Sequence, residues 1–542
     1  MTSEVQHANS DVSHHDVIVV GAGFAGLYTL HRLRGLGFNV RVVEAGSDVG
    51  GTWYWNRYPG ARCDVESLEY SYSFSDQLQQ EWVWPERFSA QPDILRYIQH
   101  VADRFDLRRH IEFDSRVESA EFDEGRDEWT VTTGKRRQLK ARFCIMATGN
   151  LSLPRVPDFP GLEDFKGKWY HSGLWPHEKV DFTGQRVGLI GTGASGIQIT
   201  PNVAKEAAHL YVFQRTANYS VPSVNRPTDE KEMQGYKARY AEIRRSQKNS
   251  AYGIAGFEVP TLSAIEVDAE TRARTYEEKW GLGGNISFLA AYNDILLNKA
   301  SNETACQFVR EKIKSIVKDP ETAELLCPKD HYIGTKRLPL EIDYFATFNR
   351  DNVTLVDVRN YPVKRITKDG ILTKKQAYEL DAIIFATGFD AMTGALLDIN
   401  VKGLGGKTLQ SKWAGGPLTY LGLMTAGFPN FFIMTGPGAP SVKTNMIPHI
   451  EQHADWITDC IDYLSRNKHV RMEADAKREQ EWVKHVDDVA NATLYPLAES
   501  WYVGANIPGK PRFFMPYIGG LDKYTKLCNA VAANGYDGFH IR

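Results

Sequence analysis

Residues 16–44 read DVIVVGAGFAGLYTLHRLRGLGFNVRVVE, and this stretch decides the fold. The apolar, β-branched run at 16–21 predicts a strand that is buried on both faces. The spacing of apolar residues over 27–37 predicts a helix, and 39–44 predicts a second strand. A glycine-rich turn, GAGFAG, joins the first strand to the helix. This order of elements is typical of a dinucleotide-binding unit.

Each glycine of the turn has its own physical task. Gly21 permits the tight turn, Gly23 lets a pyrophosphate approach the backbone, and Gly26 allows the helix to pack closely on the strand. The free N–H groups at the start of the helix bind phosphate. Glu44, at the end of the second strand, is placed to accept hydrogen bonds from a ribose. An ordinary glycine-containing loop is the alternative.

The same pattern recurs later in the chain. Residues 186–190, RVGLI, predict a strand, GTGASG at 191–196 opens a helix, and HLYVFQR predicts a strand that ends at Arg215. A guanidinium at this strand end pairs with a 2′-phosphate, whereas an acid would repel it. The first site therefore suits FAD and the second suits NADPH. The alternative for Arg215 is a solvated charge at the end of a strand.

Two further apolar strands, at 143–149 and 381–388, end in Thr-Gly. They resemble the places where the chain crosses between domains in flavoproteins with two dinucleotide domains. We expect an α/β fold with two Rossmann-like dinucleotide-binding domains, for FAD and NADP, and a helical insertion. The FAD-binding domain is expected over 1–148 and 380–542, the NADP-binding domain over 150–225 and 333–379, and the insertion over 226–332. Within the insertion, apolar residues from Phe308 to Val317 share one helical face, and Pro320 is expected to end that helix.

Composition excludes several classes of protein. The chain has 542 residues, with 64 Lys and Arg against 67 Asp and Glu, so a net charge of −3 gives no bias toward nucleic acid or an anionic membrane. No apolar run approaches the roughly 20 residues that span a bilayer, and the polar first fifteen residues, His14 and His15 included, suggest a leader without a signal peptide. We expect a soluble, cytoplasmic protein.

The cysteine and histidine patterns give no metal or redox motif. The six cysteines include no CxxC pair, which excludes a zinc ribbon and nearly eliminates a flavin disulfide reductase. His449 and His453 share a helix face, but Ile450 stands where a zinc protease needs Glu. We therefore expect no metal.

Residues 165–176, FKGKWYHSGLWP, separate the two glycine turns and narrow the class of flavoprotein. They match every fixed position of FxGxxxHxxxWP, the fingerprint of type I Baeyer–Villiger monooxygenases. From His15 to the end the chain resembles this family, and most closely its branch of phenylacetone and steroid monooxygenases. Further stretches carry the resemblance: GGTWYWNRYPGARCD (50–64), GTKRL (334–338), ATGFDAMTG (386–394) and SWYVGANIPGK (500–510).

The resemblance implies an enzyme that uses FAD, NADPH and O₂ to insert one oxygen atom next to a ketone carbonyl, giving an ester or lactone through a flavin C4a-peroxide. That peroxide has to stay anionic to attack the carbonyl, and a guanidinium beside it cannot give up a proton. The resemblance implies Arg337 for this role and Asp64 as the acid that orients it. Without the resemblance, Arg337 could belong to a surface basic pair and Asp64 to a loop.

The resemblance also implies roles at the cofactors. Lys336, Arg215 and Thr216 correspond to contacts of the 2′-phosphate, and Trp501 to a tryptophan that holds the nicotinamide nucleotide, with a core indole as the alternative. His171 is expected to have a structural role in a mobile linker. The remaining cofactor-binding candidates are Phe24, Ala25, Gly51, Thr52, Trp53, Gly191, Thr192, Gly193, Ala194, Ser195, Gly196 and Gln198, and the fingerprint residues are Phe165, Gly167, His171, Trp175 and Pro176.

In related enzymes the segment equivalent to 436–445 lines the substrate pocket. This implies pocket residues Leu338, Ser441, Val442 and Lys443. Lys443 departs from the apolar residue expected there, so it either points to solvent or makes the pocket mouth more polar. The expected partners are a small-molecule ketone and O₂, with no nucleic acid and no membrane, in a monomer or weak oligomer.

Two alternative functions stay open. A heteroatom-oxidising flavin monooxygenase needs a protonated hydroperoxide and would not require Arg337. A non-catalytic NADPH-binding protein could use the same fold.

Overall fold

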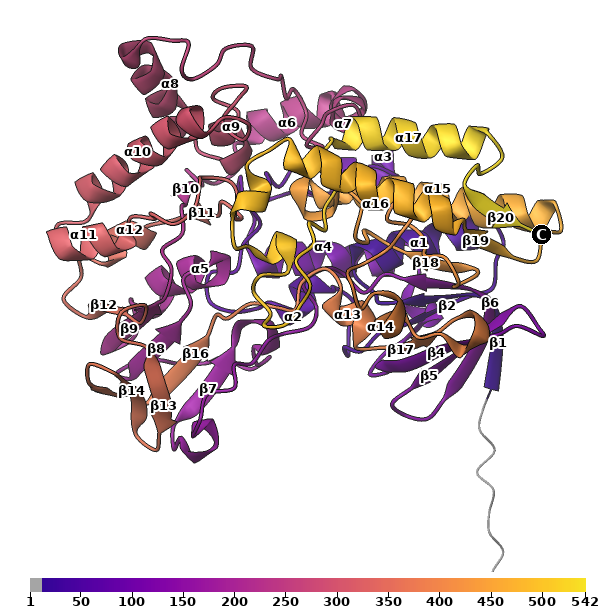
Figure 1. Cartoon of the computed structure of the whole chain (residues 1–542), viewed down its shortest axis with the longest axis horizontal. Coiled ribbons are helices and arrows are strands. Elements are labelled where there is room, and N and C mark those ends of the chain that lie inside the picture. Colours follow the sequence, from indigo (N-terminus) through magenta and orange to yellow (C-terminus); the bar gives the residue numbers. More distant parts are fainter. Residues whose placement is uncertain (1–11) are drawn as a thin grey trace, which may run out of the picture.

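A computed structural model describes residues 12–542, which form an α/β fold around two sheets, as the sequence predicts. The first sheet has eight strands in the order β17-β4-β5-β6-β1-β2-β3, with β18 also paired to β6 (Figure 1). Its strands are β1 (Val12–Val20), β2 (Val40–Val43), β3 (Ile111–Glu112), β4 (Val117–Asp123), β5 (Glu128–Thr133), β6 (Gln138–Met146), β17 (Asn400–Lys402) and β18 (Phe431–Ile433).

Strand β1 begins earlier than the sequence indicates. His14 and His15 pair with Lys140 and Ala141 of β6, so the expectation that they belong to a leader is wrong. The long parallel ladder with β6 extends the strand beyond its apolar half. Residues 1–11 of the expected leader lie outside the described residues.

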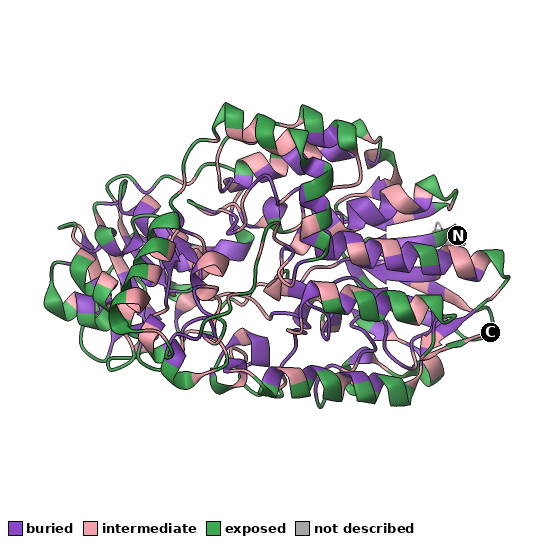
Figure 2. Ribbon diagram, turned by 90° about the horizontal axis from the view of Figure 1, so that it is seen from above, coloured by how far each residue is buried: buried purple, intermediate pink, exposed green. Residues whose placement is uncertain are grey.

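Helices cover the first sheet. Helix α1 (Phe24–Gly35) follows β1 directly and packs on α15 (Met446–Arg466). Further helices around this sheet are α4 (Gln91–Arg104), α16 (Ala476–Asn491) and α17 (Leu521–Ala533). Buried residues lie along the strands and on the inward sides of these helices (Figure 2), so one apolar core holds the turn between β1 and α1.

The second sheet has five strands in the order β12-β9-β8-β16-β7. Strand β8 (Arg186–Ile190) has the predicted bounds, β9 spans His209–Gln214, and α5 (Ala194–Val203) opens at the second glycine turn. The other strands are β7 (Lys168–His171), β12 (Val353–Asp357) and β16 (Ala382–Phe385). Strand β16 pairs with β8 and β7, although the sequence assigns residues from 380 onward to the first domain. Strand β16 thus completes the second sheet, on the far side of the boundary expected at 379/380.

The two segments that connect the sheets lie side by side. The backbone N–H of Arg155 donates to the carbonyl of Gly388 at 3.0 Å, and that of Asp390 donates to Leu153 at 2.9 Å. Both segments follow the predicted Thr-Gly strand ends. The chain therefore passes between the sheets twice at one place.

The insertion is helical, as the sequence predicts. It contains α6 (Glu230–Ala238), α7 (Tyr240–Lys248), α8 (Ala269–Leu282), α9 (Asn285–Leu289), α10 (Lys299–Ile316) and α11 (Pro320–Leu326). Helix α10 ends at Ile316, and Pro320 begins α11, with the Asp319 side chain accepting from Thr322 N–H. The expectation that Pro320 ends α10 is corrected, because a proline also fits the first turn of a helix.

Short elements complete the fold. They are α2 (Thr52–Trp55), α3 (Asp76–Glu81), α12 (Tyr344–Thr347), α13 (Gly394–Leu397), α14 (Leu409–Lys412), β10 (Val221–Pro222), β11 (Leu340–Glu341), β13 (Val363–Thr367), β14 (Gly370–Thr373), β15 (Ala377–Glu379), β19 (Met472–Ala474) and β20 (Phe539–Ile541). Over residues 12–542, none of the helices combines the length and the apolar character that crossing a bilayer requires.

Candidate active site

Both glycine turns open onto one cavity of about 1150 Å³. Gly21 has φ +105° and Gly191 has φ +114°, conformations that residues with a side chain rarely adopt, and these allow the sharp turn from strand to helix. A Cβ on Gly26 would collide with the carbonyl oxygen of Gly21, and Gly196 bears the same relation to Gly191. Gly26 and Gly196 therefore serve packing and do not line the cavity.

The helices that start at these turns leave their first N–H groups available. The residues before α1 and α5 are Gly23 and Gly193, so no side chain caps either helix. A Cβ at Gly193 would meet no atom within 4 Å, which leaves open space in front of α5. Two uncapped helix ends that face one cavity fit the phosphates of two dinucleotides.

Glu44 lies at the wall of the first nucleotide site. Its carboxylate accepts from the N–H groups of Ala22 and Gly46, both at 2.7 Å. Burial raises the pKa of Glu44 above its ordinary value, although these N–H groups oppose the rise. The other predicted residues of the first site that line the cavity are Gly21, Gly23, Phe24, Ala25, Gly51, Thr52, Trp53 and Asp64.

Two cations lie at the second nucleotide site. Arg215 is exposed at the end of β9, and its positive charge acts on the nearby side chain of Lys336. Burial, and then the positive charge of Arg215, lower the pKa of Lys336, while Asp330 opposes them. A pair of neighbouring cations fits a phosphate dianion. The other predicted residues of the second site that line the cavity are Gly191, Thr192, Gly193, Ala194, Ser195, Gln198, Thr216 and Trp501.

Asp64 and Arg337 form an ion pair where the two sites meet. Both the Nη2 and the Nε of Arg337 donate to Asp64 Oδ2, at 2.7 and 3.2 Å. The Asp64 side chain is only 5% exposed, whereas that of Arg337 is 36% exposed. Burial works most strongly against the charge of Arg337, but the charge and hydrogen bonds of Asp64 together with the nearby Tyr502 raise the pKa of Arg337. The guanidinium is therefore a permanent cation at the cavity wall.

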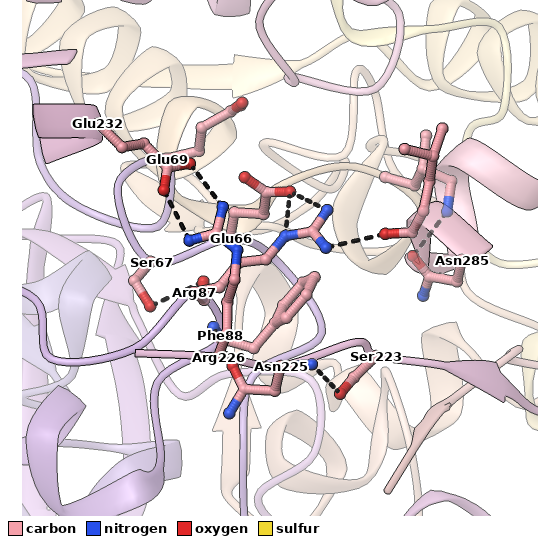
Figure 3. Close-up of polar contacts among 12 residues, drawn as sticks. Glu66, Ser67, Glu69, Arg87, Phe88, Ser223, Asn225, Arg226, Glu232 and Asn285 are labelled. Carbon is pink, nitrogen blue, oxygen red and sulfur yellow. Dashed lines mark hydrogen bonds and ion pairs between the residues drawn. The ribbon is translucent and has the colours of Figure 1, made fainter. Parts of the chain in front are cut away.

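A polar network around Arg87, drawn in Figure 3, links the segment that follows Asp64 to the insertion. Arg87 donates to Glu66 at 2.7 and 2.9 Å and to the carbonyl of Leu282 at 2.8 Å. Three residues further on, Asn285 Nδ2 donates to the carbonyl of Leu338 at 3.0 Å. Leu338 is the chain neighbour of Arg337. The insertion thus links the segment that contains Asp64 to the segment that contains Arg337.

The fingerprint residues lie outside the cavity wall. His171 is buried, its Nδ1 accepts from Gly173 N–H at 3.0 Å, and its Nε2 lies 3.1 Å from the carbonyl of Arg155. Thr387 Oγ1 donates to that same carbonyl. His171 therefore ties the two connecting segments together, in line with a structural role. Phe165 and Trp175, which precede and follow His171 in the sequence, are also buried. A Cβ on Gly167 would collide with the carbonyl of Asp381.

The predicted pocket loop contributes in part. Leu338, Val442 and Lys443 line the cavity, but Ser441 is fully buried behind the wall, where Asn150 Nδ2 donates to its Oγ at 2.6 Å. The cavity is also lined by residues that the sequence did not single out, which are Tyr58, Tyr252, Asn285, Tyr495 and Tyr502. Tyr58 and Tyr502 lie within stretches that carry the family resemblance, 50–64 and 500–510, whereas Tyr252, Asn285 and Tyr495 lie in segments that carry no motif.

Comparison with known proteins agrees with this geometry. Residues 14–239 match the family model described as flavin-binding monooxygenase-like. A Baeyer–Villiger monooxygenase of Pseudooceanicola batsensis is 42% identical over 539 residues, which cover 99% of this chain and 98% of that protein. A solved structure of oxidised steroid monooxygenase bound to NADP is 51% identical with a TM-score of 0.93, covering 98% of this chain and 99% of that one. Phenazine N-monooxygenase of Lysobacter antibioticus is also similar, at 40% identity over 98% of each protein.

The chain belongs to the Baeyer–Villiger monooxygenases, a family of flavin-binding enzymes. It is an NADPH-dependent flavin monooxygenase with FAD as its cofactor, and the family resemblance seen in the fingerprint is confirmed. Members of this family insert one oxygen atom next to a ketone carbonyl.

Proposed function

We propose that this enzyme oxidises a small-molecule ketone to an ester or lactone, with the Arg337 guanidinium, held by Asp64, as the fixed cation of the reaction. The observation that carries the proposal is the Arg337–Asp64 ion pair, which lines the same cavity as both glycine turns. It stands between the two dinucleotide sites, where a cofactor and a substrate would meet.

Bound FAD, once reduced by NADPH, supplies the activation of O₂. Arg337 contributes a positive charge that cannot be lost as a proton, so it favours negative charge on an oxygen beside it and on the oxygen of an attacked carbonyl. At ~4 Å and an effective dielectric constant near 20, one such charge contributes up to roughly 4 kcal/mol. Asp64 orients the guanidinium through its buried carboxylate.

The two glycine turns at the cavity suggest where each cofactor would bind. The first turn with Glu44 would hold FAD, and the second turn with Arg215, Thr216 and Lys336 would hold the 2′-phosphate of NADPH. We propose an NADP-binding unit that extends through β16, since this strand pairs within the second sheet. We propose a monomer or weak oligomer in a cytoplasmic setting, and six free cysteines support a reducing compartment.

The second candidate is oxidation of a heteroatom. The similarity to phenazine N-monooxygenase favours it, because that protein is named for oxidation at nitrogen. Heteroatom oxidation calls for a protonated oxidant and would not require the cation. The ion pair at the cavity wall therefore favours the ketone.

The test is Arg337→Ala in the holoenzyme, assayed with a panel of cyclic, aryl-alkyl and steroid ketones and one thioether. We expect NADPH consumption to persist while ester formation falls by about a thousandfold, since ~4 kcal/mol is about three decades in rate, and H₂O₂ to accumulate. Arg350→Ala, an exposed arginine of the same unit outside the cavity wall, is the matched control. Ester formation by the Arg337 variant at near the wild-type rate would contradict the role of Arg337, and a wild-type enzyme that oxidises only the thioether would favour the second candidate.

A further inference from the structure

Lys443 occupies an unusual place for a lysine, inside the cavity wall. Its Nζ lies 4.1 Å from the ring centre of Tyr495 and 4.5 Å from that of Tyr502, and it donates to the Tyr502 hydroxyl at 3.5 Å. Two aromatic faces hold the ammonium by cation–π attraction. The side chain therefore does not extend into open solvent. Of the two alternatives that the sequence allows, a more polar pocket fits the structure.

The backbone that carries Lys443 is firmly held. It ends a short 3₁₀ turn, Ser441–Lys443, whose first N–H donates to His449 Nδ1 at 3.1 Å. The Ser441 hydroxyl accepts from Asn150, and the Asn445 side chain begins α15 by accepting from Ile447 N–H. A side chain on such a platform presents its charge at one place in the cavity.

The charge that acts on Lys443 is that of another cation. Arg337 lies close enough to oppose the charge of Lys443, and its own charge is already paired with Asp64. Within residues 12–542, no carboxylate forms an ion pair with Lys443, whose charged neighbour is Arg337. The other titratable groups near it are the tyrosines 495 and 502, and burial raises the pKa of both, so they stay neutral.

We propose that Lys443 is a specificity-determining residue whose ammonium binds a carboxylate on the ketone substrate, so that this enzyme prefers keto acids over neutral ketones. The inference rests on the proposed function and adds the substrate class. The ketone carbonyl would lie toward Arg337, and the carboxylate would lie against Lys443 and the Tyr502 hydroxyl.

Charge balance supports this assignment. Burial, and then the charge of Arg337, lower the pKa of Lys443 to about 7, so the free enzyme holds this ammonium at a cost. A carboxylate that enters the cavity removes that cost by supplying the missing counter-charge. The 2′-phosphate of NADPH has its own cations, Arg215 and Lys336, which leaves Lys443 for the substrate.

The test compares levulinate, a ketone with a carboxylate, with its neutral methyl ester in the holoenzyme. We expect kcat/KM to favour levulinate in the wild type, and Lys443→Met to lower the ratio of levulinate to ester by about 10–100-fold, as for loss of a charge-assisted hydrogen bond. Lys443→Arg should retain most of the ratio. Lys407→Met, at an exposed lysine outside the cavity wall, is the control and should leave the ratio as in the wild type.

A second readout needs no turnover. Calorimetric titration of oxidised holoenzyme with levulinate should give a Kd that rises about 10–100-fold in Lys443→Met. An unchanged ratio and an unchanged Kd would overturn the proposal, and so would a change confined to the KM for NADPH, which would place Lys443 in the nucleotide site. A wild-type enzyme that oxygenates neither these compounds nor any ketone of the panel, yet binds levulinate through Lys443, would refute the proposed function alone.

Discussion

Arg337 and Asp64 meet through a single oxygen. Both donating nitrogens of the guanidinium contact Oδ2, while Oδ1 is buried and has no hydrogen-bond partner. Asp64 therefore holds the guanidinium of Arg337 through one oxygen, Oδ2.

Asp64→Asn should separate the charge of this residue from its shape. The amide keeps the volume but leaves Arg337 without its counter-charge, so we expect ester yield per NADPH to fall at least tenfold. Because Arg337 is partly exposed, the loss of stability should be about 1–3 kcal/mol, below that of a fully buried pair. Product yield and the thermal midpoint Tm measure the two effects. An unchanged yield in a folded variant would show that Asp64 does not position the cation.

Arg215→Ala should affect one nicotinamide nucleotide and spare the other. Loss of a charged contact to the 2′-phosphate should raise the KM for NADPH by about 10–100-fold, with little change for NADH. Steady-state kinetics with both nucleotides measure this. Equal losses for NADPH and NADH would place Arg215 outside phosphate recognition.

The preference for a keto acid should depend on pH. The pKa of Lys443 lies at about 7, below its ordinary value, so the ammonium prevails below pH 7 and is lost above it. Levulinate binding should therefore weaken as the pH rises from 6 to 9, while binding of the methyl ester should not follow this trend. In Lys443→Met the slope should vanish; a slope that persists there would belong to another group.

Gly26→Ala should destabilise the first dinucleotide site. The added Cβ would collide with the carbonyl of Gly21, and we expect a loss of about 1–3 kcal/mol in the free energy of unfolding together with reduced FAD content. Gly35→Ala in the same helix is the matched control, since no atom lies within 4 Å of its Cβ position. That variant should be neutral or slightly more stable. Equal behaviour of the two variants would argue against close packing at Gly26.

Arg87→Met should reveal whether the insertion helps to position the ion pair. The change removes the hydrogen bonds to Glu66 and Leu282, so we expect lower ester yield per NADPH as well as a lower Tm. Arg96→Met removes an ion pair whose arginine side chain is 63% exposed, and it should be near neutral. A lower Tm with an unchanged yield would assign Arg87 to stability alone.

Local patterns predicted the parts of the fold that are contiguous in sequence. The bounds of β8 and the glycine turns could be predicted because burial on both faces and the phosphate turn each impose a short pattern. The place of β16 could not, because a buried apolar strand carries no mark of the sheet that it joins. The same limit applies to Tyr495, whose contact with Lys443 depends on how a distant loop packs.

The position of Lys443 also depended on tertiary packing. From the sequence, a lysine in this glycine- and proline-rich loop is expected either to point to solvent or to line the pocket. Its contacts with the rings of Tyr495 and Tyr502 place it in the pocket. Because 273 residues separate Asp64 from Arg337 in the chain, only the family resemblance could predict that they form an ion pair.

The order of strands along the chain has a consequence for synthesis on the ribosome. The second sheet is complete once residue 385 has emerged, whereas the first sheet waits for β17 and β18, which end at residue 433. Until then β4 and β6 lack neighbours that they have in the finished protein. The half of the molecule that is made first is therefore the last to be finished, and during this interval its open strands need protection from aggregation.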